Sequence, residues 1–250
     1  MDITNLINKE QFYAGIPTEI PNLCSIYPAT LREIAKIGVK NFYSYLNFFT
    51  LNKEDIDEYL NQISAQEQEM TVFQFHLANA YIDKAYLKNL QDAFLFFLHE
   101  DIVLLPNNEA IVIGDIKENR IIREKEFEVI SKIISMQHSV EGAEEEQSNP
   151  SDARAAQILK KIKERKKKLS KAKDSDLTFV DLVASLAAKG NGLNAINVWD
   201  LTYYAFNDQF KRMQWIEEYD NALKSLLAGA KKESVNLTHW IRPMNEQNKK

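Results

Sequence analysis

The stretch WDLTYYAFNDQFKRM, residues 199–213, decides the fold class of the C-terminal part of the chain. Its large apolar side chains recur at spacings of four, three, four and three residues: Trp199, Tyr203, Phe206, Phe210 and Met213. At about 100° per residue they fall within an arc of about 80°, which predicts an amphipathic helix. Asp208, Lys211 and Arg212 point roughly the other way, as expected of a polar face.

Two further helices are predicted beside this stretch. Thr178-Phe-Val-Asp181 has the pattern of a capping box, although Asp stands where Glu or Gln is usual. The helix that it starts should run to Ala188 and end in the glycine-containing residues 189–192. A final helix is expected from Glu217 to Ala228, before Gly229.

The N-terminal half mixes helices with a few strands. Helices are predicted at about 5–13, 30–36, 41–49, after an Asn52 cap, at 71–98 as one or two helices, and at 124–136. The only convincing strands are short β-branched runs with turn residues between them, at 102–105, 110–113 and 120–123. The prediction is a mainly α protein: an N-terminal α+β part with a small antiparallel β meander, and a C-terminal helical part.

Charge divides the chain near its middle. Residues 141–150 are acidic and carry Ser, Asn and Pro, whereas residues 160–173 hold nine Lys or Arg and one acid, Glu164. We therefore expect an N-terminal domain at 1–137, an acidic flexible linker at 138–152, a basic helix at 153–174 and a C-terminal domain at 175–250.

Composition places the chain among ordinary globular proteins. It has 250 residues, 45% of them hydrophobic, and a net charge of −5. Cys24 is the only cysteine, which excludes an internal disulfide and fits a reducing compartment. No apolar run approaches the roughly 18 residues of a membrane span, and the first residues lack a signal-peptide pattern. A cytoplasmic protein without a membrane partner is expected.

The sequence offers no constellation for catalysis. The four histidines are scattered, and none has the spacing of a zinc ligand pair with another His or with Cys24. Neither a P-loop nor a dinucleotide-binding glycine pattern occurs, and Lys189-Gly-Asn-Gly192 fits a helix end better than a phosphate loop. We expect no catalytic residue, no metal, no cofactor and no enzymatic activity.

The basic segment allows three interpretations of its role. Its charges include Lys160, Lys161, Lys163, Arg165, Lys166, Lys167 and Lys168. They could form a solvated face, dock on an acidic protein or contact nucleic acid. Nucleic acid is the least favoured, because no aromatic residue is interleaved, the charges surround the helix and lysine outnumbers arginine.

The C-terminal block resembles phage proteins from Gram-positive hosts over about residues 150–242. The resemblance rests on Asp176–Asn194, on Asn197–Phe210 and on Glu218–Ala230, and the opening Phe12-Tyr-Ala-Gly-Ile-Pro17 is similar to the same group. These proteins belong to the tail module of phages and prophages and resemble tail assembly chaperones. The resemblance implies a non-enzymatic helper, in the host cytoplasm, that binds the tape measure protein while the tail tube polymerises around it.

The aromatic face of residues 199–213 is mainly expected to be core, but Leu201 and Tyr204 lie off it and, with Trp215 and Trp240, indicate a second apolar surface. We expect partner contacts from Trp199, Leu201, Tyr203, Tyr204, Trp215 and Trp240. The partner would be the tape measure or another tail protein, with self-association possible. A structural virion component, such as a connector or baseplate protein, is the main alternative. A nucleic-acid-binding regulator that uses the basic helix is the weaker one.

Overall fold

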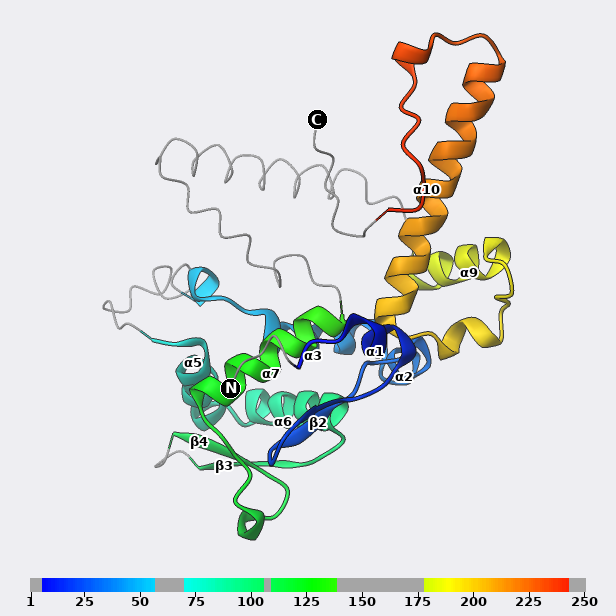
Figure 1. The fold of residues 1–250 in the computed structure, drawn as a ribbon. Coiled ribbons are helices and arrows are strands. Elements are labelled where there is room, and N and C mark those ends of the chain that lie inside the picture. Colours follow the sequence, from blue (N-terminus) through cyan, green and yellow to red (C-terminus); the bar gives the residue numbers. More distant parts are fainter. Residues whose placement is uncertain (1–5, 57–69, 106–108, 139–177, 243–250) are drawn as a thin grey trace, which may run out of the picture.

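The computed structural model describes residues 6–56, 70–105, 109–138 and 178–242. It is mainly α-helical, with a two-stranded and a three-stranded antiparallel sheet in the N-terminal half, so the predicted fold class is confirmed. Figure 1 shows a helical body with the strands on one side and one long helix, α10, that projects from it. The basic segment and the acidic stretch before it lie outside the described residues.

The body is built on four helices that share an aromatic core. They are α3 (Val39–Thr50), α5 (Val72–Ile82), α6 (Lys84–Leu98) and α7 (Glu124–Gln137). Phe42, Phe94 and Phe97 are completely buried, and Phe49 lies with its ring centre 5.2 Å from that of Phe94 and 5.5 Å from that of Phe97. Aromatic side chains bury large apolar areas in preferred edge-to-face geometries, so this cluster is the main source of stability of the body.

The predicted β meander is confirmed at the lower edge of the body. β3 (Ile102–Leu105) pairs antiparallel with β4 (Ala110–Ile113), and β4 pairs with β5 (Ile121–Ile122). A 3-10 turn, η3 (Ile116–Glu118), joins the last two strands. All four residues of β4 are buried, as expected of the central strand of a sheet that lies on helices.

The expectation that strands occur only after residue 102 is wrong. β1 (Thr18–Ile20) and β2 (Cys24–Ile26) form a second hairpin. The turn has Pro21 followed by Asn22 at φ 60°, and the Leu23 N–H closes it on the Ile20 carbonyl at 3.0 Å. Pro and Asn are the residues that a type II turn prefers at these positions. Each of these strands has only three residues and lies close to a proline. The alternation of apolar and polar residues was therefore too short to predict a strand from the sequence.

The first two helices of the chain begin at side-chain caps. α1 (Lys9–Ala14) begins after Asn8, whose side chain accepts the N–H groups of Glu10 and Gln11. α2 (Leu31–Ile37) begins with a complete capping box between Thr30 and Glu33. Such boxes satisfy two backbone N–H groups that the helix leaves unpaired.

The C-terminal part contains α9 (Phe179–Lys189), the 3-10 turn η4 (Asn197–Asp200), α10 (Tyr203–Leu227) and a short turn η5 (Lys232–Ser234). The Thr178–Asp181 capping box is present, with Asp in place of the usual Glu. Trp199 lies in η4 and not on the long helix, because Leu201 is extended and Thr202 caps α10. The predicted separate helix 217–228 is also wrong, since nothing between Met213 and Glu217 interrupts α10.

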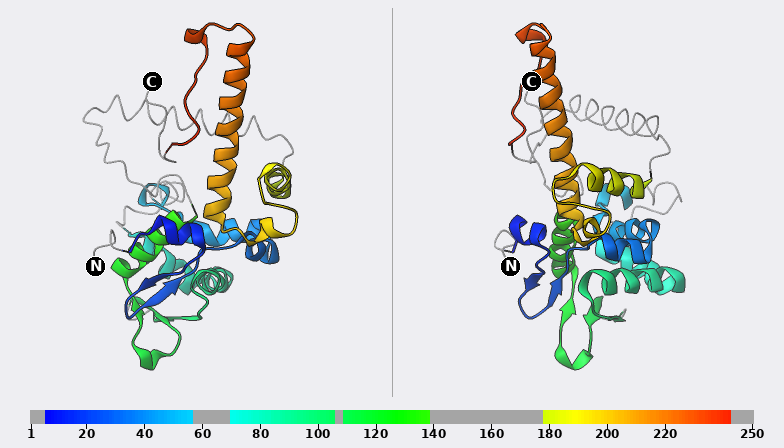
Figure 2. Two further views of the ribbon diagram at one scale, coloured as in Figure 1. Left: turned by 45° about the vertical axis from the view of Figure 1, so that its right-hand side comes forward. Right: turned by 90° about the vertical axis from the view of Figure 1, so that its right-hand side faces the viewer.

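Two turned views show that the far half of α10 stands clear of the body, with the following segment beside it (Figure 2). Twenty-five residues at 1.5 Å per residue make α10 about 37 Å long. We call residues 211–227, together with segment 230–242, the arm, and residues 197–210 its root. Within the part of the chain that the structure describes, no helix is both long enough and apolar enough to cross a membrane.

Candidate protein-binding arm

Backbone pairing fixes the root of the arm to the body. The Leu31 N–H donates to the Leu201 carbonyl at 2.9 Å, and the Tyr203 N–H donates to the Ala29 carbonyl at 2.8 Å. The buried Thr202 hydroxyl donates to the Phe12 carbonyl at 3.1 Å and accepts the Ala205 N–H, which caps α10. The starting point and direction of α10 are thus held by segments about 170 to 190 residues away in sequence.

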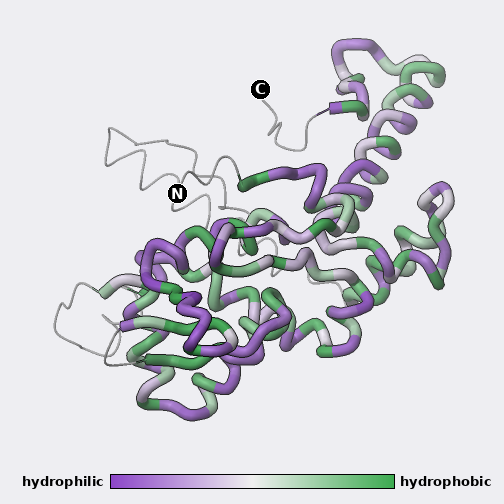
Figure 3. The backbone as a smooth tube through the Cα atoms, turned by 60° about the horizontal axis from the view of Figure 1, so that its bottom comes forward, coloured by the Kyte–Doolittle hydropathy of each residue, from purple (hydrophilic) through white to green (hydrophobic). Residues whose placement is uncertain are grey.

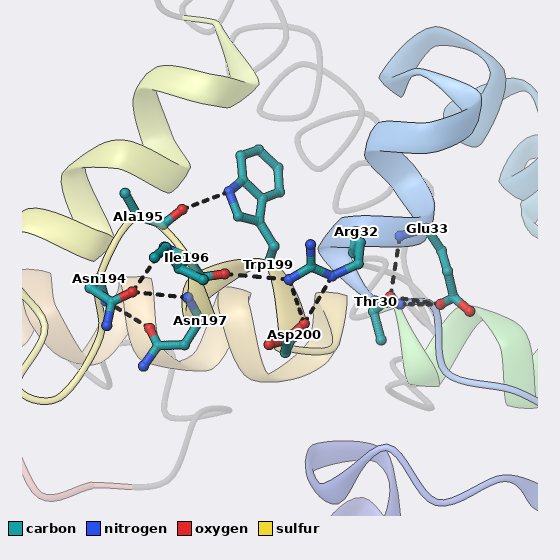
Figure 4. A network of polar contacts seen from close by, with 9 residues as sticks. All are labelled: Thr30, Arg32, Glu33, Asn194, Ala195, Ile196, Asn197, Trp199 and Asp200. Atoms are coloured by element: carbon teal, nitrogen blue, oxygen red, sulfur yellow. Dashed lines mark hydrogen bonds and ion pairs between the residues drawn. The ribbon is translucent and has the colours of Figure 1, made fainter.

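A polar network beside this pairing joins α2 to η4 (Figure 4). Arg32 donates from Nε and Nη2 to one carboxylate oxygen of Asp200, at 2.9 and 2.7 Å, and Nη2 also reaches the Ile196 carbonyl at 3.4 Å. The Trp199 indole N–H donates to the Ala195 carbonyl at 3.1 Å. These bonds orient the turn that leads into the root.

The Arg32–Asp200 pair should contribute little free energy, because its side chains are 49% and 65% exposed. In a double-mutant cycle of Arg32→Ala and Asp200→Ala, we expect a coupling energy of about 0.5–1 kcal/mol in the free energy of unfolding. Urea denaturation of the four variants measures it. A coupling above about 2 kcal/mol would mean that the pair is far better shielded from water than its exposure indicates.

Aromatic rings complete the root. Tyr203 packs with its ring centre 5.1 Å from Phe42 and 6.1 Å from His138, and its hydroxyl lies 3.1 Å from that of Tyr43. Burial raises the pKa of Tyr203 far above its ordinary value. Tyr204, on the neighbouring side of α10, meets the ring of Phe12 at 5.9 Å. The root therefore shares the aromatic core of the body.

The arm has a different construction, with a groove between α10 and segment 230–242. The segment runs back along the helix, since His239 lies beside Tyr219 at 5.2 Å and Arg242 lies over the ring of Trp215 at 4.2 Å. The groove is open to one side and has a volume of about 730 Å³. Its lining is Lys211, Trp215, Glu218, Tyr219, Asn221, Ala222, Ser225, Ser234, Val235, Asn236, Thr238 and Arg242.

Trp215 forms the apolar floor of the groove between two cations. Trp215 is only 7% exposed, and the Lys211 ammonium lies 5.4 Å from its ring centre. Arg242 is held by this ring and by a longer contact of 3.7 Å with Glu218, while its Nε is buried without a hydrogen-bond partner. A groove that offers an apolar ring, amide and hydroxyl groups and a cation fits a peptide surface better than a single metabolite.

The predicted partner residues do not form one surface. Leu201 and Tyr203 pack against the shared core, Tyr204 covers Phe12, and Trp199 lies in η4, where its indole N–H bonds the Ala195 carbonyl. Trp215 lies in the groove, whereas Trp240 stacks on His239 at 5.7 Å in the segment beside it. The structure brings together the root residues and, separately, the arm residues. Their role in partner contact stays a prediction.

Several residues of the arm, of the root and of the helix that holds the root were not predicted from the sequence. Arg32 and Asp200 are 168 positions apart, so no spacing could connect them. Arg242 and Asn236 line the groove from a segment without periodicity, and no local signal indicates that it folds back. Asp208, assigned to a polar face, is buried and pairs with Arg212 at 2.7 Å. An acid four residues before an arginine was the available signal for that pair.

Chemistry-bearing groups elsewhere in the described chain are not assembled into a site. Burial raises the pKa of the Cys24 thiol to about 12, which opposes formation of a thiolate nucleophile. Residues 6–56, 70–105, 109–138 and 178–242 contain no group of three or more His, Cys, Asp or Glu placed to hold a metal ion. The basic residues 160–168 lie outside these ranges, so all three interpretations of the basic segment stay predictions.

Comparison with known proteins adds one finding for the C-terminal part. Residues 167–245 match the family model described as YomV second domain, and YomV is a Bacillus phage or prophage protein. The match supports a phage-related protein and takes in α9, the root and the arm. No curated protein and no solved structure matches the chain.

Proposed function

We propose that the chain is a non-enzymatic phage protein that binds another polypeptide through its arm, as a tail assembly chaperone that holds the tape measure protein. The observation that carries the proposal is the groove on a helix rooted in the body but standing clear of it. A projecting element with an open groove can accept a long partner without steric hindrance from the body.

The chemistry of the groove supports a helical partner with apolar side chains and some acids. Tyr219 and Val235, which are partly exposed in the lining, provide apolar contact, and amphipathic helices commonly bind such grooves. Lys211 and Arg242 would meet acidic residues of the partner, while Asn221 and Asn236 offer hydrogen bonds at the edges. The family match over the same residues supports the phage context.

Filling the groove tests the proposal. In Ser225→Glu, a longer acidic side chain replaces a small one in the lining and repels the acidic residues expected of the partner, so retention of a tape measure fragment by the immobilised chain should fall at least tenfold. Gln214→Glu is the control, because Gln214 is exposed on the same helix but does not line the groove. Failure of the wild type to retain the fragment, or equal retention by both variants, would contradict the proposal.

Purified phage particles separate this function from the alternative of a structural virion protein. A chaperone should be absent from particles or scarce in them, as measured by quantitative mass spectrometry. Stoichiometric copies per particle would instead establish a connector or baseplate component.

A further inference from the structure

A second face of the arm carries apolar side chains that are partly or largely exposed. Ile216 is 38% exposed, Leu227 is 88% exposed and Leu223 is half-buried. At about 100° per residue, these three fall within about 40° on α10, and we call them the apolar row. Figure 3 shows apolar residues recurring among polar ones along this helix as far as its tip.

The apolar row is separate from the faces that are already in use. Trp215, Ala222 and Leu226 lie about 100° to one side, where segment 230–242 covers the helix. Phe206 and Phe210 lie about 100° to the other side, where α9 packs with the Phe179 ring 5.7 Å from that of Phe206. The row therefore serves neither the groove nor the core.

Charges beside the row identify its occupant. Asp220 and Lys224 are four residues apart on α10. Both are exposed, and both flank the row on the same side. If two copies of α10 pair antiparallel about a two-fold axis near residue 222, Asp220 of each lies beside Lys224 of the other, and Ile216 faces Leu227. In a parallel two-fold pair the charged flanks would lie on opposite edges of the contact, so neither Asp220 nor Lys224 would gain an oppositely charged partner.

We propose that two copies of this chain associate through antiparallel contact of their apolar rows. The arrangement is the isologous contact of a two-fold dimer, in which one patch complements itself. The contact spans 12 residues, or about 18 Å of helix, which is short for a permanent interface. The dimer should therefore form and dissociate with protein concentration.

A charge exchange tests both the occupant and its orientation. Asp220→Lys and Lys224→Asp should each weaken dimerisation at least tenfold in sedimentation equilibrium, whereas the double exchange should restore it to within about threefold of wild type. Gln214→Lys, on another face of α10, should leave it unchanged. All these positions are exposed, so circular dichroism should show unaltered folding. A wild type that stays monomeric at millimolar concentration, or a double exchange as weak as the single ones, would overturn the proposal.

Engineered cysteines give an independent measure of the antiparallel register. Oxidation of an equal mixture of Ile216→Cys and Leu227→Cys proteins should yield a cross-linked heterodimer at several times the amount of either homodimer. The native Cys24 is buried and present in every sample. Preferential homodimers of Ile216→Cys would indicate parallel arms and contradict the proposed contact.

Discussion

Replacing Phe42 by alanine is expected to lower the free energy of unfolding by about 3–5 kcal/mol. Phe42 is completely buried and its ring meets Phe97 of α6 at 6.5 Å, His138 at the end of α7 at 5.7 Å and Tyr203 of the root at 5.1 Å. Removing it leaves a cavity where the body and the root meet, and the rings around it cannot all move to fill that space.

Two probes show whether the body and the root unfold together. The tryptophans Trp199, Trp215 and Trp240 all lie in the C-terminal part, so their fluorescence follows the root and arm, whereas far-ultraviolet circular dichroism follows all helices. Urea transitions by the two probes should coincide in the wild type and shift together in the variant. A fluorescence transition well before the dichroism transition would contradict a shared core.

Tyr43→Ala is the matched control for Phe42→Ala. Tyr43 is the next residue of α3, is 48% exposed and has its hydroxyl 3.1 Å from that of Tyr203. Its removal should cost about 1 kcal/mol or less, since a partly exposed hydrogen bond contributes modestly. Equal losses in the two variants would mean that burial of Phe42 is not what holds the root.

The elements that the sequence predicts best are those with local signals. β-branched runs with turn residues between them located β3 and β4, and the Thr178–Asp181 box located the start of α9. The four residues Tyr203, Phe206, Phe210 and Met213 do lie on one core-facing side of α10. In each case the information lies within a few neighbouring residues, where periodicity and capping act.

Features that depend on distant segments escaped prediction. The end of η4 and the start of α10 are set by pairing with residues 29–31, which removes Trp199 from the helix that its spacing favoured. The groove exists because segment 230–242 returns along α10, where Arg242 and His239 make aromatic contacts with the helix. Such long-range contacts leave no periodic trace in the chain.

Acidification should destabilise the protein well before its carboxylates are neutralised. His76 and His138 are both buried, and desolvation lowers the pKa of each from 6.5 to about 4. Between these pH values the unfolded chain takes up protons on both imidazoles and the folded chain does not. The stabilisation is therefore complete above about pH 6.5 and is lost as pH falls toward 4, with a loss of about 3 kcal/mol for each histidine.

The contacts of His138 explain why its neutral form is required. Nδ1 lies 2.7 Å from the Ile134 carbonyl, which can only accept, and Nε2 lies 3.3 Å from the Ala29 N–H, which can only donate. The ring must carry one proton, on Nδ1. A second proton on Nε2 would face the Ala29 N–H and weaken the segment that holds Tyr203 through the Ala29 carbonyl. Protonation thus acts on the attachment of the arm as well as on the body.

His138→Gln isolates this effect, because a glutamine amide can donate to Ile134 and accept from Ala29 without titrating. The variant should be less stable than wild type at pH 7.5, since it loses ring packing against Phe97. Between pH 6.5 and 4, however, its free energy of unfolding should decrease by about 3 kcal/mol less than that of wild type. Urea titrations at half-unit pH intervals measure both slopes. If the slope of His138→Gln equals that of wild type, His138 takes up its proton in the folded state, and the proposed link between acid and the root of the arm fails.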